Sequence, residues 1–368
     1  SDTLVGVKTN HPYIRIRDMY QSYPLEINDK FEYITEDTHQ KIKQYIVEEG
    51  DVIIAVVGNT IGLVSLIGKS LNGANLTENC DKIVNLHNYD NRFLYYFLKS
   101  QEGQDEIRKG IVGSSQPKLP IYNIERFEIP DISIDIQMKI VEIIEGIDKK
   151  IKTNEEINKN LEQQAQAIYQ QMFIDNARSD STEGTLSDIA DITMGQSPSG
   201  SSYNEDGNGT IFFQGRAEFG FRFPTVRLYT TEPKRMACAN DTLMSVRAPV
   251  GDLNVAHTDC CIGRGLAAIH SKNNHQSFVL YTMFSLKKQL DVFNGEGTVF
   301  GSINRNSLNE MPILIPSSEK LDEFEALVAP MDAAIRNNYD EICRLEQLRD
   351  SLLPQLMSGE LDVSDIDL

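Results

Sequence analysis

One stretch near the end of the chain has the residue types of a cofactor-binding loop. Residues 291–297 read DVFNGEG, which has the form D-x-F-x-G-x-G. Loops of this form bind S-adenosylmethionine in many enzymes that methylate nucleic acids, so methyl transfer is the first chemistry to consider. A glycine pattern alone has little specificity, and its structural context decides whether it can bind a cofactor.

The rest of the chain does not support catalysis. The six histidines form no H-E-x-x-H or similar ligand spacing, and the sequence has no G-x-x-x-x-G-K-[ST] loop and no G-x-S-x-G turn. The N-P-P-Y or D-P-P-Y tetrapeptide that an amino-methyltransferase needs is also missing. Five cysteines without a C-x-x-C pair predict neither a disulfide scaffold nor a zinc site. We therefore expect no catalytic residue, metal ion or cofactor in this chain.

The charge is distributed unevenly. The net charge of −19 argues against nucleic acid if the chain is taken as a whole. Residues 184–310, however, contain 11 Lys and Arg against 12 Asp and Glu, and residues 1–125 contain 13 against 17. These two segments can therefore carry a local basic face. No run of eighteen apolar residues predicts a membrane span, and the thiols fit a reducing cytoplasm, where we expect the protein to be located.

The elements that would position any site occur twice in the sequence. GSSQPKLPIYNI, from Gly113, aligns with GTVFGSINRNSL, which begins 184 positions later at Gly297. Upstream, FLYYFLKS resembles FVLYTMFS, GDVIIAVVGNTIG resembles NDTLMSVRAPVG, and YIRIRD resembles FFQGRA. Each half thus has a β-rich region of more than one hundred residues followed by a helical region.

Secondary-structure patterns are the same in both halves. DVIIAVV and DTLMSVR predict short buried strands, and local helices are predicted over residues 91–109 and 277–293. Apolar residues at spacings of three and four then predict two long helices of about 35–38 residues, or about 50–57 Å. Two long helices with one apolar face each are expected to pack together in antiparallel fashion.

This context argues against a cofactor loop at DVFNGEG. The residues before it are predicted to be helical, whereas a cofactor loop of this kind follows a strand, and the first copy has no matching D-x-F. A methyltransferase would also need a parallel sheet with alternating strands and helices, which the sequence does not show.

Two asparagines interrupt the apolar stripes at equivalent positions, Asn154 and Asn338. A polar residue at a helix–helix seam lowers stability but can determine the register, and the alternative is that both are solvated surface residues. The predicted seam consists of Ile140, Ile144, Ile147, Ile151, Asn154, Leu161, Ile168, Met331, Ile335, Asn338, Ile342, Leu345 and Leu352.

The repeated order of motifs resembles the DNA-specificity subunits of type I restriction-modification systems. LSDIADITMGQSPSG, the small-residue loops GSSQPKLP and GTVFGSIN, and the strand–proline–helix transitions at Pro130 and Pro316 carry this resemblance over nearly the whole chain. It implies an α+β fold with two β-rich target-recognition domains, two long antiparallel coiled-coil helices and a pseudo-two-fold internal repeat. The opening strand of the first domain has no counterpart in the sequence, which is expected of either a trimmed or a naturally short form.

The resemblance also implies domain limits. We expect a first target-recognition domain at residues 1–130, a first spacer helix at 131–176, a second domain at 177–316, a second spacer helix at 317–358 and an acidic tail at 359–368.

The function implied by the resemblance is non-catalytic. The chain would read a bipartite, asymmetric target on double-stranded DNA and dock two methyltransferase subunits, with restriction and translocase subunits in the full complex. S-adenosylmethionine, ATP and Mg²⁺ would bind to those partner subunits. The alternatives are a specificity module of another restriction-modification type, or a coiled-coil adaptor that does not bind DNA, which the acidic charge favours.

DNA contacts need cations for phosphates and Arg, Gln or Asn for base edges. Among the candidates, we favour Arg216, Arg222 and Arg247, because they lie beside turn or aromatic residues. The full set is Arg15, Arg17, Asn59, Lys69, Gln116, Lys118, Gln196, Ser197, Gln214, Arg216, Arg222, Arg227, Arg247, Arg264 and Arg305.

Overall fold

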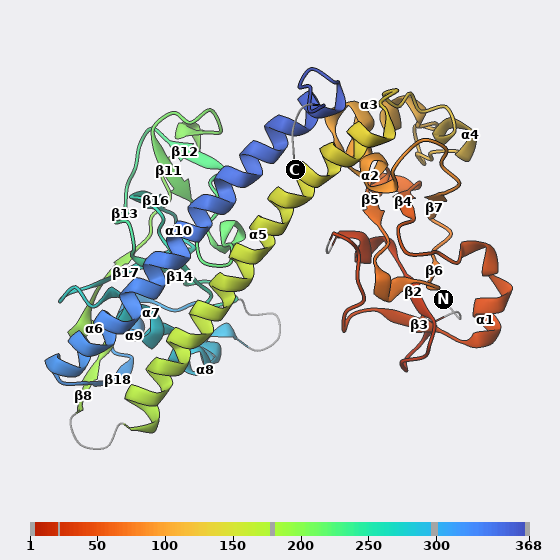
Figure 1. The fold of residues 1–368 in the computed structure, drawn as a ribbon. Helices are drawn as coiled ribbons and strands as arrows, with labels where there is room; N and C mark the ends of the chain where they lie inside the picture. The colour runs from red at the N-terminus through yellow and green to blue at the C-terminus, as the bar shows by residue number, and fades with distance from the viewer. Residues whose placement is uncertain (1–3, 21–22, 177–180, 296–300, 365–368) are drawn as a thin grey trace. The chain divides into compact units, whose positions relative to one another are not determined.

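The chain divides into two compact units, each built around one of the β-rich regions. The structure, a computed structural model, describes residues 4–20, 23–176, 181–295 and 301–364. Ser1–Thr153 and Asp340–Leu368 form the first unit, and Asn154–Tyr339 form the second. Each unit contains one β-rich domain and a stretch of each of two long helices (Figure 1). The predicted α+β class and duplicated architecture are confirmed.

The first unit has two small sheets. One has the order β1-β3-β2-β6, formed by Leu4–Val5, Glu32–Ile34, Pro12–Ile14 and Asn75–Leu76. The other has the order β5-β4-β7, formed by Val64–Leu66, Val52–Ala55 and Cys80–Ile83. β2 and β6 are parallel, and the other pairs are antiparallel.

The central strand β4 is buried on both faces. Val52 and Ile54 belong to the core that also contains α2 and parts of both long helices. Ile53 and Ala55 belong to a second core, on the side of β2 and β6. Successive side chains of a strand point to opposite faces, so a run of apolar, mostly β-branched residues joins the two cores.

The helix predicted at residues 91–109 is in fact two helices, α2 (Asn91–Lys99) and α3 (Gln101–Gly110). Ser100 separates them, because its side chain accepts a hydrogen bond from the backbone N–H of Gly103 and so caps α3. A Cβ on Gly103 would lie 2.0 Å from the carbonyl oxygen of Phe97, so only glycine permits this sharp turn. Apolar periodicity alone could not reveal the break.

The second unit repeats this plan with longer strands. A five-stranded sheet has the order β10-β12-β11-β16-β13, formed by Tyr203–Asn204, Leu228–Thr230, Thr210–Phe213, Cys260–Ile262 and Met236–Ala237. A four-stranded sheet has the order β15-β14-β17-β9, formed by Leu253–Val255, Thr242–Ser245, Leu266–Ser271 and Ala190–Met194. β18 (Pro312–Ile315) pairs with β8 (Thr182–Thr185).

The DVFNGEG stretch begins in helical structure. α7 (Gln276–Ser285) and α8 (Lys287–Leu290) are followed directly by the 3-10 helix Asp291–Asn294. The helical context predicted for this stretch is confirmed up to Asn294, and residues 296 and 297 lie outside the described residues. The short helices α6 (Leu186–Ile189) and α9 (Arg305–Asn309) complete the unit.

The two long helices are α5 (Ile134–Tyr169, 36 residues) and α10 (Ser318–Met357, 40 residues). In the first unit Asp148 pairs with Arg349 at 2.9 Å and Lys150 with Glu341 at 3.6 Å, so α5 and α10 run in opposite directions. In the second unit the amides of Asn158 and Asn338 lie 2.8 Å apart, and Glu162 and Asp332 share Arg222, which gives the same direction. The predicted antiparallel packing is therefore present in both units.

The predicted seam positions are all shielded from solvent to some degree. Ile140, Ile144, Ile151, Asn154, Ile335 and Ile342 are buried, and Ile147, Leu161, Ile168, Met331, Asn338, Leu345 and Leu352 are half-buried. In the first unit, part of the acidic tail is also packed, because Val363 is buried against the core that contains α2.

Asn338 pairs across the seam with Asn158, a residue that the sequence pattern did not single out. The Asn338 side-chain amide donates to Asn158 Oδ1, and Asn158 donates in turn to the backbone carbonyl of Ile335 at 3.4 Å. Asn158 is only 3% exposed, so its amide depends on these partners. Asn154 is equally buried, which rules out the solvated alternative for that residue.

We predict that Asn158→Ala lowers the free energy of unfolding by about 1–3 kcal/mol, because it leaves the Asn338 amide without its partner in the seam. The double substitution of Asn158 and Asn338 by Leu should recover most of this loss, since it removes both polar groups. Urea unfolding of the three proteins measures both values. Equal stability of Asn158→Ala and the unaltered protein would show that the amide pair contributes nothing.

Candidate DNA interface

Five of the candidate residues converge at one end of the sheets in the second unit. The turn Gly263–Leu266 connects β16 to β17 and is closed by a hydrogen bond of 3.0 Å from Leu266 N to Gly263 O. Arg264 occupies the exposed tip of this turn, and its backbone N–H donates to Ser197 Oγ at 3.2 Å. The residue before Ser197, Gln196, donates its backbone N–H to Ile262 O at 2.9 Å.

Glycines hold this turn close to Gln214. A Cβ on Gly263 would lie 2.8 Å from the carbonyl oxygen of Gln214 and 3.0 Å from its Cα. A Cβ on Gly195 would lie 2.1 Å from Gly263 O. The backbones after β9, after β11 and between β16 and β17 are therefore in direct contact, which places Gln196, Gln214 and Arg264 side by side.

Arg247 joins this group from the end of β14. Val246 N donates to Gly265 O at 2.9 Å, so the strand passes alongside the Arg264 turn. Arg247 itself forms a β-bridge with Ser302, and its side chain is exposed. We call Gln196, Ser197, Gln214, Arg247, Arg264 and Ser302 the second loop end.

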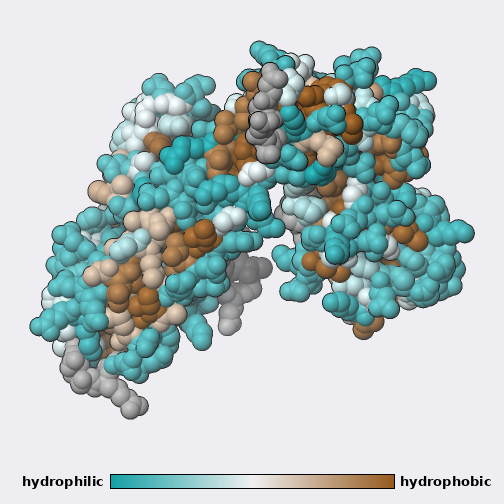
Figure 2. Space-filling model, in the orientation of Figure 1, coloured by the Kyte–Doolittle hydropathy of each residue, from teal (hydrophilic) through white to brown (hydrophobic). Residues whose placement is uncertain are grey.

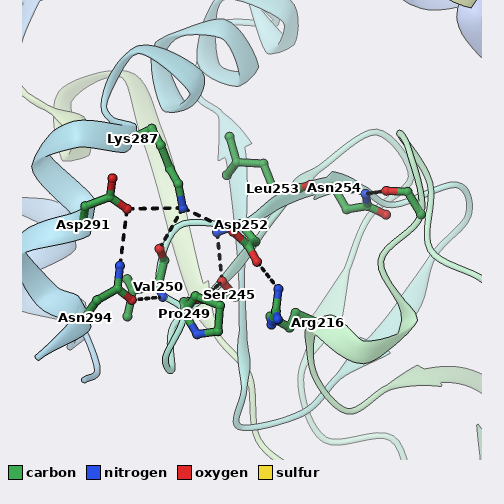
Figure 3. Close-up of polar contacts among 11 residues, drawn as sticks. Arg216, Ser245, Pro249, Val250, Asp252, Leu253, Asn254, Lys287, Asp291 and Asn294 are labelled. Atoms are coloured by element: carbon green, nitrogen blue, oxygen red, sulfur yellow. Dashed lines mark hydrogen bonds and ion pairs between the residues drawn. The ribbon is translucent and has the colours of Figure 1, made fainter. Parts of the chain in front are cut away.

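A polar network holds the loop that follows β14, as Figure 3 shows. The backbone N–H of Asp252 donates to Ser245 Oγ at 2.9 Å, and its carboxylate pairs with Lys287 at 3.2 Å and with Arg216. Asn294 Oδ1 accepts a bond of 2.6 Å from the Val250 backbone. The loop that starts at Arg247 is thus anchored to α8 and to the residues after it.

The first unit has the same set of backbone hydrogen bonds and β-bridges, which we call the backbone frame. The turn Thr77–Cys80 links β6 to β7 and is closed by a hydrogen bond of 3.1 Å from Cys80 N to Thr77 O. Val56 N donates to Asn79 O at 3.0 Å, as Val246 N does to Gly265 O in the second unit. Val57 bridges to Lys118, as Arg247 bridges to Ser302.

The parallel strand pairs of the two units, β2 with β6 and β11 with β16, also correspond. Thr77 N donates to Ile14 O at 3.0 Å, and Gly263 N donates to Phe213 O at 2.8 Å. Arg15 therefore corresponds to Gln214, since each follows the parallel strand. The first loop end consists of Arg15, Val57, Asn59, Glu78, Gln116 and Lys118. Asn59 is included because the 3-10 helix Gly58–Thr60 follows Val57, and Gln116 because Gly58 N donates to the carbonyl oxygen of its neighbour Pro117 at 3.0 Å. Val57 and Glu78 were not among the candidates.

The candidate cations differ in their partners. Arg15 and Arg17 both pair with Glu32, Arg216 pairs with Asp252, and Arg227 pairs with Glu205 and Glu218. Within the described residues, Lys69, Lys118, Arg247, Arg264 and Arg305 are exposed and form no ion pair. Lys69 lies in the 3-10 helix Lys69–Leu71, apart from the residues that define the first loop end.

Arg222, which we favoured as a DNA contact on an exposed loop, is buried in the structure. Its side chain is 4% exposed and bonds to Glu162 at 2.9 Å, Asp332 at 3.1 Å and the Tyr281 hydroxyl at 3.1 Å. These partners lie on α5, α10 and α7. Burial opposes its charge, but Tyr281, Asp332 and Glu162 together raise the pKa of Arg222 above its usual value. We therefore assign Arg222 to the attachment of the domain to the long helices.

A hydrogen bond from a tyrosine hydroxyl to an aspartate attaches each domain to a long helix. In the first unit the Tyr96 hydroxyl donates to Asp148 of α5 at 2.8 Å, and in the second Tyr281 donates to Asp332 of α10 at the same distance. Asp148 and Asp332 are 184 positions apart, the repeat distance of the sequence. A different cation completes each site. Arg349 of α10 lies 2.9 Å from Asp148 in the first unit, and Arg222 lies 3.1 Å from Asp332 in the second.

Residues 5–163 and 178–336 both match the family described as the type I restriction modification DNA specificity domain. The chain belongs to this family. As a type I specificity subunit it recognises the DNA target of a restriction-modification enzyme, and its family is non-catalytic.

Individual relatives of this specificity subunit agree. A Methanocaldococcus jannaschii protein described as the MjaX type I restriction enzyme specificity subunit is 29% identical over 388 residues, covering 97% of this chain and 88% of its own. The HindI specificity subunit of Haemophilus influenzae is 23% identical, with coverage of 73% and 77%. The type I S subunit from M. genitalium shares the fold, with a TM-score of 0.60 at 16% identity over 99% of this chain and 92% of that one.

Among the described residues, no group of three or more His, Cys, Asp or Glu side chains is arranged to hold a metal ion. In the same part of the chain, no helix combines the length and apolar character needed to cross a membrane. The two loop ends remain the sites where exposed cations and amides gather on a repeated frame.

We predict that Arg222→Met lowers the free energy of unfolding by about 3–5 kcal/mol, because it leaves the half-buried carboxylates of Glu162 and Asp332 without their buried cation. Arg247→Met is the matched control, since Arg247 is exposed and unpaired within the described residues, and it should change stability by less than about 0.5 kcal/mol. Denaturant unfolding of both variants measures the difference. Similar values for the two would contradict the structural role of Arg222.

Gly263→Ala should lower stability by about 1–3 kcal/mol and weaken DNA binding, because the new methyl group would push the Arg264 turn away from the Gln214 backbone. Gly215→Ala is its control, since nothing lies within 4 Å of the added Cβ and the backbone there is extended. Thermal unfolding and a binding titration on target duplex check both effects. A Gly263→Ala protein that matches the control would show that the close contact is dispensable.

Proposed function

We propose that each loop end reads one half of a bipartite, asymmetric DNA target. The observation that carries this proposal is the backbone frame that occurs twice with different side chains. At corresponding positions the first loop end has Arg15, Glu78 and Lys118, and the second has Gln214, Arg264 and Ser302. Equal frames present side chains in equal geometry, and unequal side chains then select different bases.

The side chains of the second loop end suit a base edge. Arginine binds the O6 and N7 atoms of guanine with two hydrogen bonds, and glutamine binds the N6 and N7 atoms of adenine in the same way. Arg247 and Arg264 are free to make such contacts, because within the described residues neither forms an ion pair. Arg305 and Lys69 are better suited to phosphates, which position a protein without selecting sequence.

The partners of the chain follow from its family and its surface. We propose that two methyltransferase subunits dock on this chain and that restriction and translocase subunits complete the enzyme. S-adenosylmethionine, ATP and Mg²⁺ bind to those subunits. Within the second unit, hydrophobic surface gathers between α5 and α10, as Figure 2 shows. Ile157 and Leu327, which are 41% and 49% exposed, lie on these helices and suit a protein contact.

The long helices also bear on the form of the target. α5 and α10 each contribute to both units without interruption, so we propose that the helix pair determines the unread spacer between the half-sites. Mapping of methylated adenines in cells that carry the chain and its methyltransferase tests this directly. Two short motifs at one constant spacing are expected, and a single continuous palindrome would refute the proposal.

Substitution of Arg264 should affect one half-site only. We predict that Arg264→Ala costs about 1–3 kcal/mol of discrimination at one base pair of the half-site read by the second domain, because it removes a bidentate contact. Lys288→Ala, which removes an exposed cation from α8, is the control and should leave the recognised motif unchanged. Methylation of a duplex library with randomised half-sites measures the preference at each position. A uniform loss at every position would instead place Arg264 on a phosphate.

A further inference from the structure

An acidic residue occupies the tip of the first loop end. The turns Thr77–Cys80 and Gly263–Leu266 are equivalent, because both follow a parallel strand and both are closed by a bond from the fourth residue to the first. Glu78 is the second residue of its turn, and Arg264 is the second residue of the other. The two turns therefore present opposite charges at the same place in the frame.

The Glu78 carboxylate is free. Its residue is exposed, and within the described part of the chain its side chain forms no ion pair or hydrogen bond. Arg15, the arginine of the same loop end, is paired with Glu32. A solvated carboxylate costs nothing in the free protein, but beside DNA it is repelled by phosphates. It is tolerated in a DNA complex only where it meets a hydrogen-bond donor.

Only some base edges offer that donor. A carboxylate accepts hydrogen bonds and cannot donate them. In the major groove guanine presents the acceptors N7 and O6, and thymine presents the acceptor O4 beside a methyl group. Adenine has the N6 amino group, but its N7 acceptor lies next to it. Cytosine has the N4 amino group without a neighbouring acceptor, so it is the base that suits a carboxylate best.

We propose that Glu78 selects cytosine at one position of the half-site read by the first domain. The inference rests on the proposed function, in which both loop ends face base edges. It goes beyond that function by naming a residue and the base it selects. It also accounts for the opposite charge at Arg264, because at the same place in the frame a guanidinium selects guanine.

The test uses the complex of the full chain with its methyltransferase partner, acting on a duplex library with randomised half-sites. Glu78→Gln keeps the shape and removes the charge, and its amide can bind adenine. We expect the preference for cytosine to fall by about 10- to 100-fold at one position of one half-site, which corresponds to 1–3 kcal/mol of discrimination. The other half-site should be unchanged.

Glu102→Gln is the matched control, because Glu102 is an exposed glutamate of the same unit that lies on α3, outside the loop end. Glu78→Asp, which keeps the carboxylate, should retain the preference for cytosine at a lower rate of methylation. An unchanged motif and rate in Glu78→Gln would overturn the assignment. So would a folded Glu78→Gln protein that loses methylation at all sequences equally.

Failure of the broader proposal would look different. If the unaltered complex methylates a library without a bipartite motif, the function proposed for the loop ends is wrong, and the role of Glu78 falls with it. If the motif is bipartite but contains no cytosine on either strand at the position that Glu78→Gln changes, only the choice of base is wrong. Thermal unfolding of each variant distinguishes these results from loss of folding.

Discussion

The larger hydrophobic core of each unit is shared between its β-rich domain and the long helices, and this constraint shapes the whole molecule. In the second unit a single core contains Tyr169 of α5, Phe173 of the π-helical segment Gln170–Asp175 that follows it, Phe324 of α10 and Phe278 of α7. In the first unit, Ile140 and Ile144 of α5 pack in one core with α2 and the end of α10. Helices with a single apolar face gain most of their stability from such packing. Domain and helix pair therefore fold as one body within each unit.

Polar side chains divide into two groups on this scaffold. One group is wholly or partly buried and attaches the domain to the helices, as the half-buried Asp148 and Asp332 do through their tyrosines. The other group is exposed at the loop ends, where backbone contacts hold the chain and Glu78, Arg247 and Arg264 form no ion pair within the described residues. Arg222 and Arg247 show that the same residue type serves both purposes. Sequence at the loop ends can vary without disturbing the core, which suits a protein that must specify one target among many.

Much of the architecture could be predicted because it depends on regular patterns. The repeat distance of 184 positions located Asp148 and Asp332 at equivalent places, and spacings of three and four located α5 and α10. Gln196, Gln214 and Arg264 were candidates by residue type alone, and Arg247 also because it lies beside a turn. What the sequence could not reveal is that hydrogen bonds between distant strands bring them together.

The errors have equally specific causes. Arg222 lies in an aromatic stretch that looks like a surface loop, but its partners Glu162 and Asp332 are 60 and 110 residues away, and only the fold brings them near. The break between α2 and α3 depends on a cap at Ser100, which periodicity does not detect. Glu78 was not predicted, because a carboxylate is neither a cation for phosphates nor one of the Arg, Gln or Asn side chains expected at base edges. Alignment of the two turns would have placed it opposite Arg264.

The central claim is that two equivalent loop ends contact two separate stretches of one DNA duplex. Hydroxyl-radical footprinting of the complex between this chain and its methyltransferase on its own target tests the claim most directly. We predict two protected segments with an unprotected spacer between them, and the loss of one segment alone when Arg247 and Arg264 are both replaced by alanine. One continuous protected segment, or the equal loss of both segments in that variant, would contradict the claim.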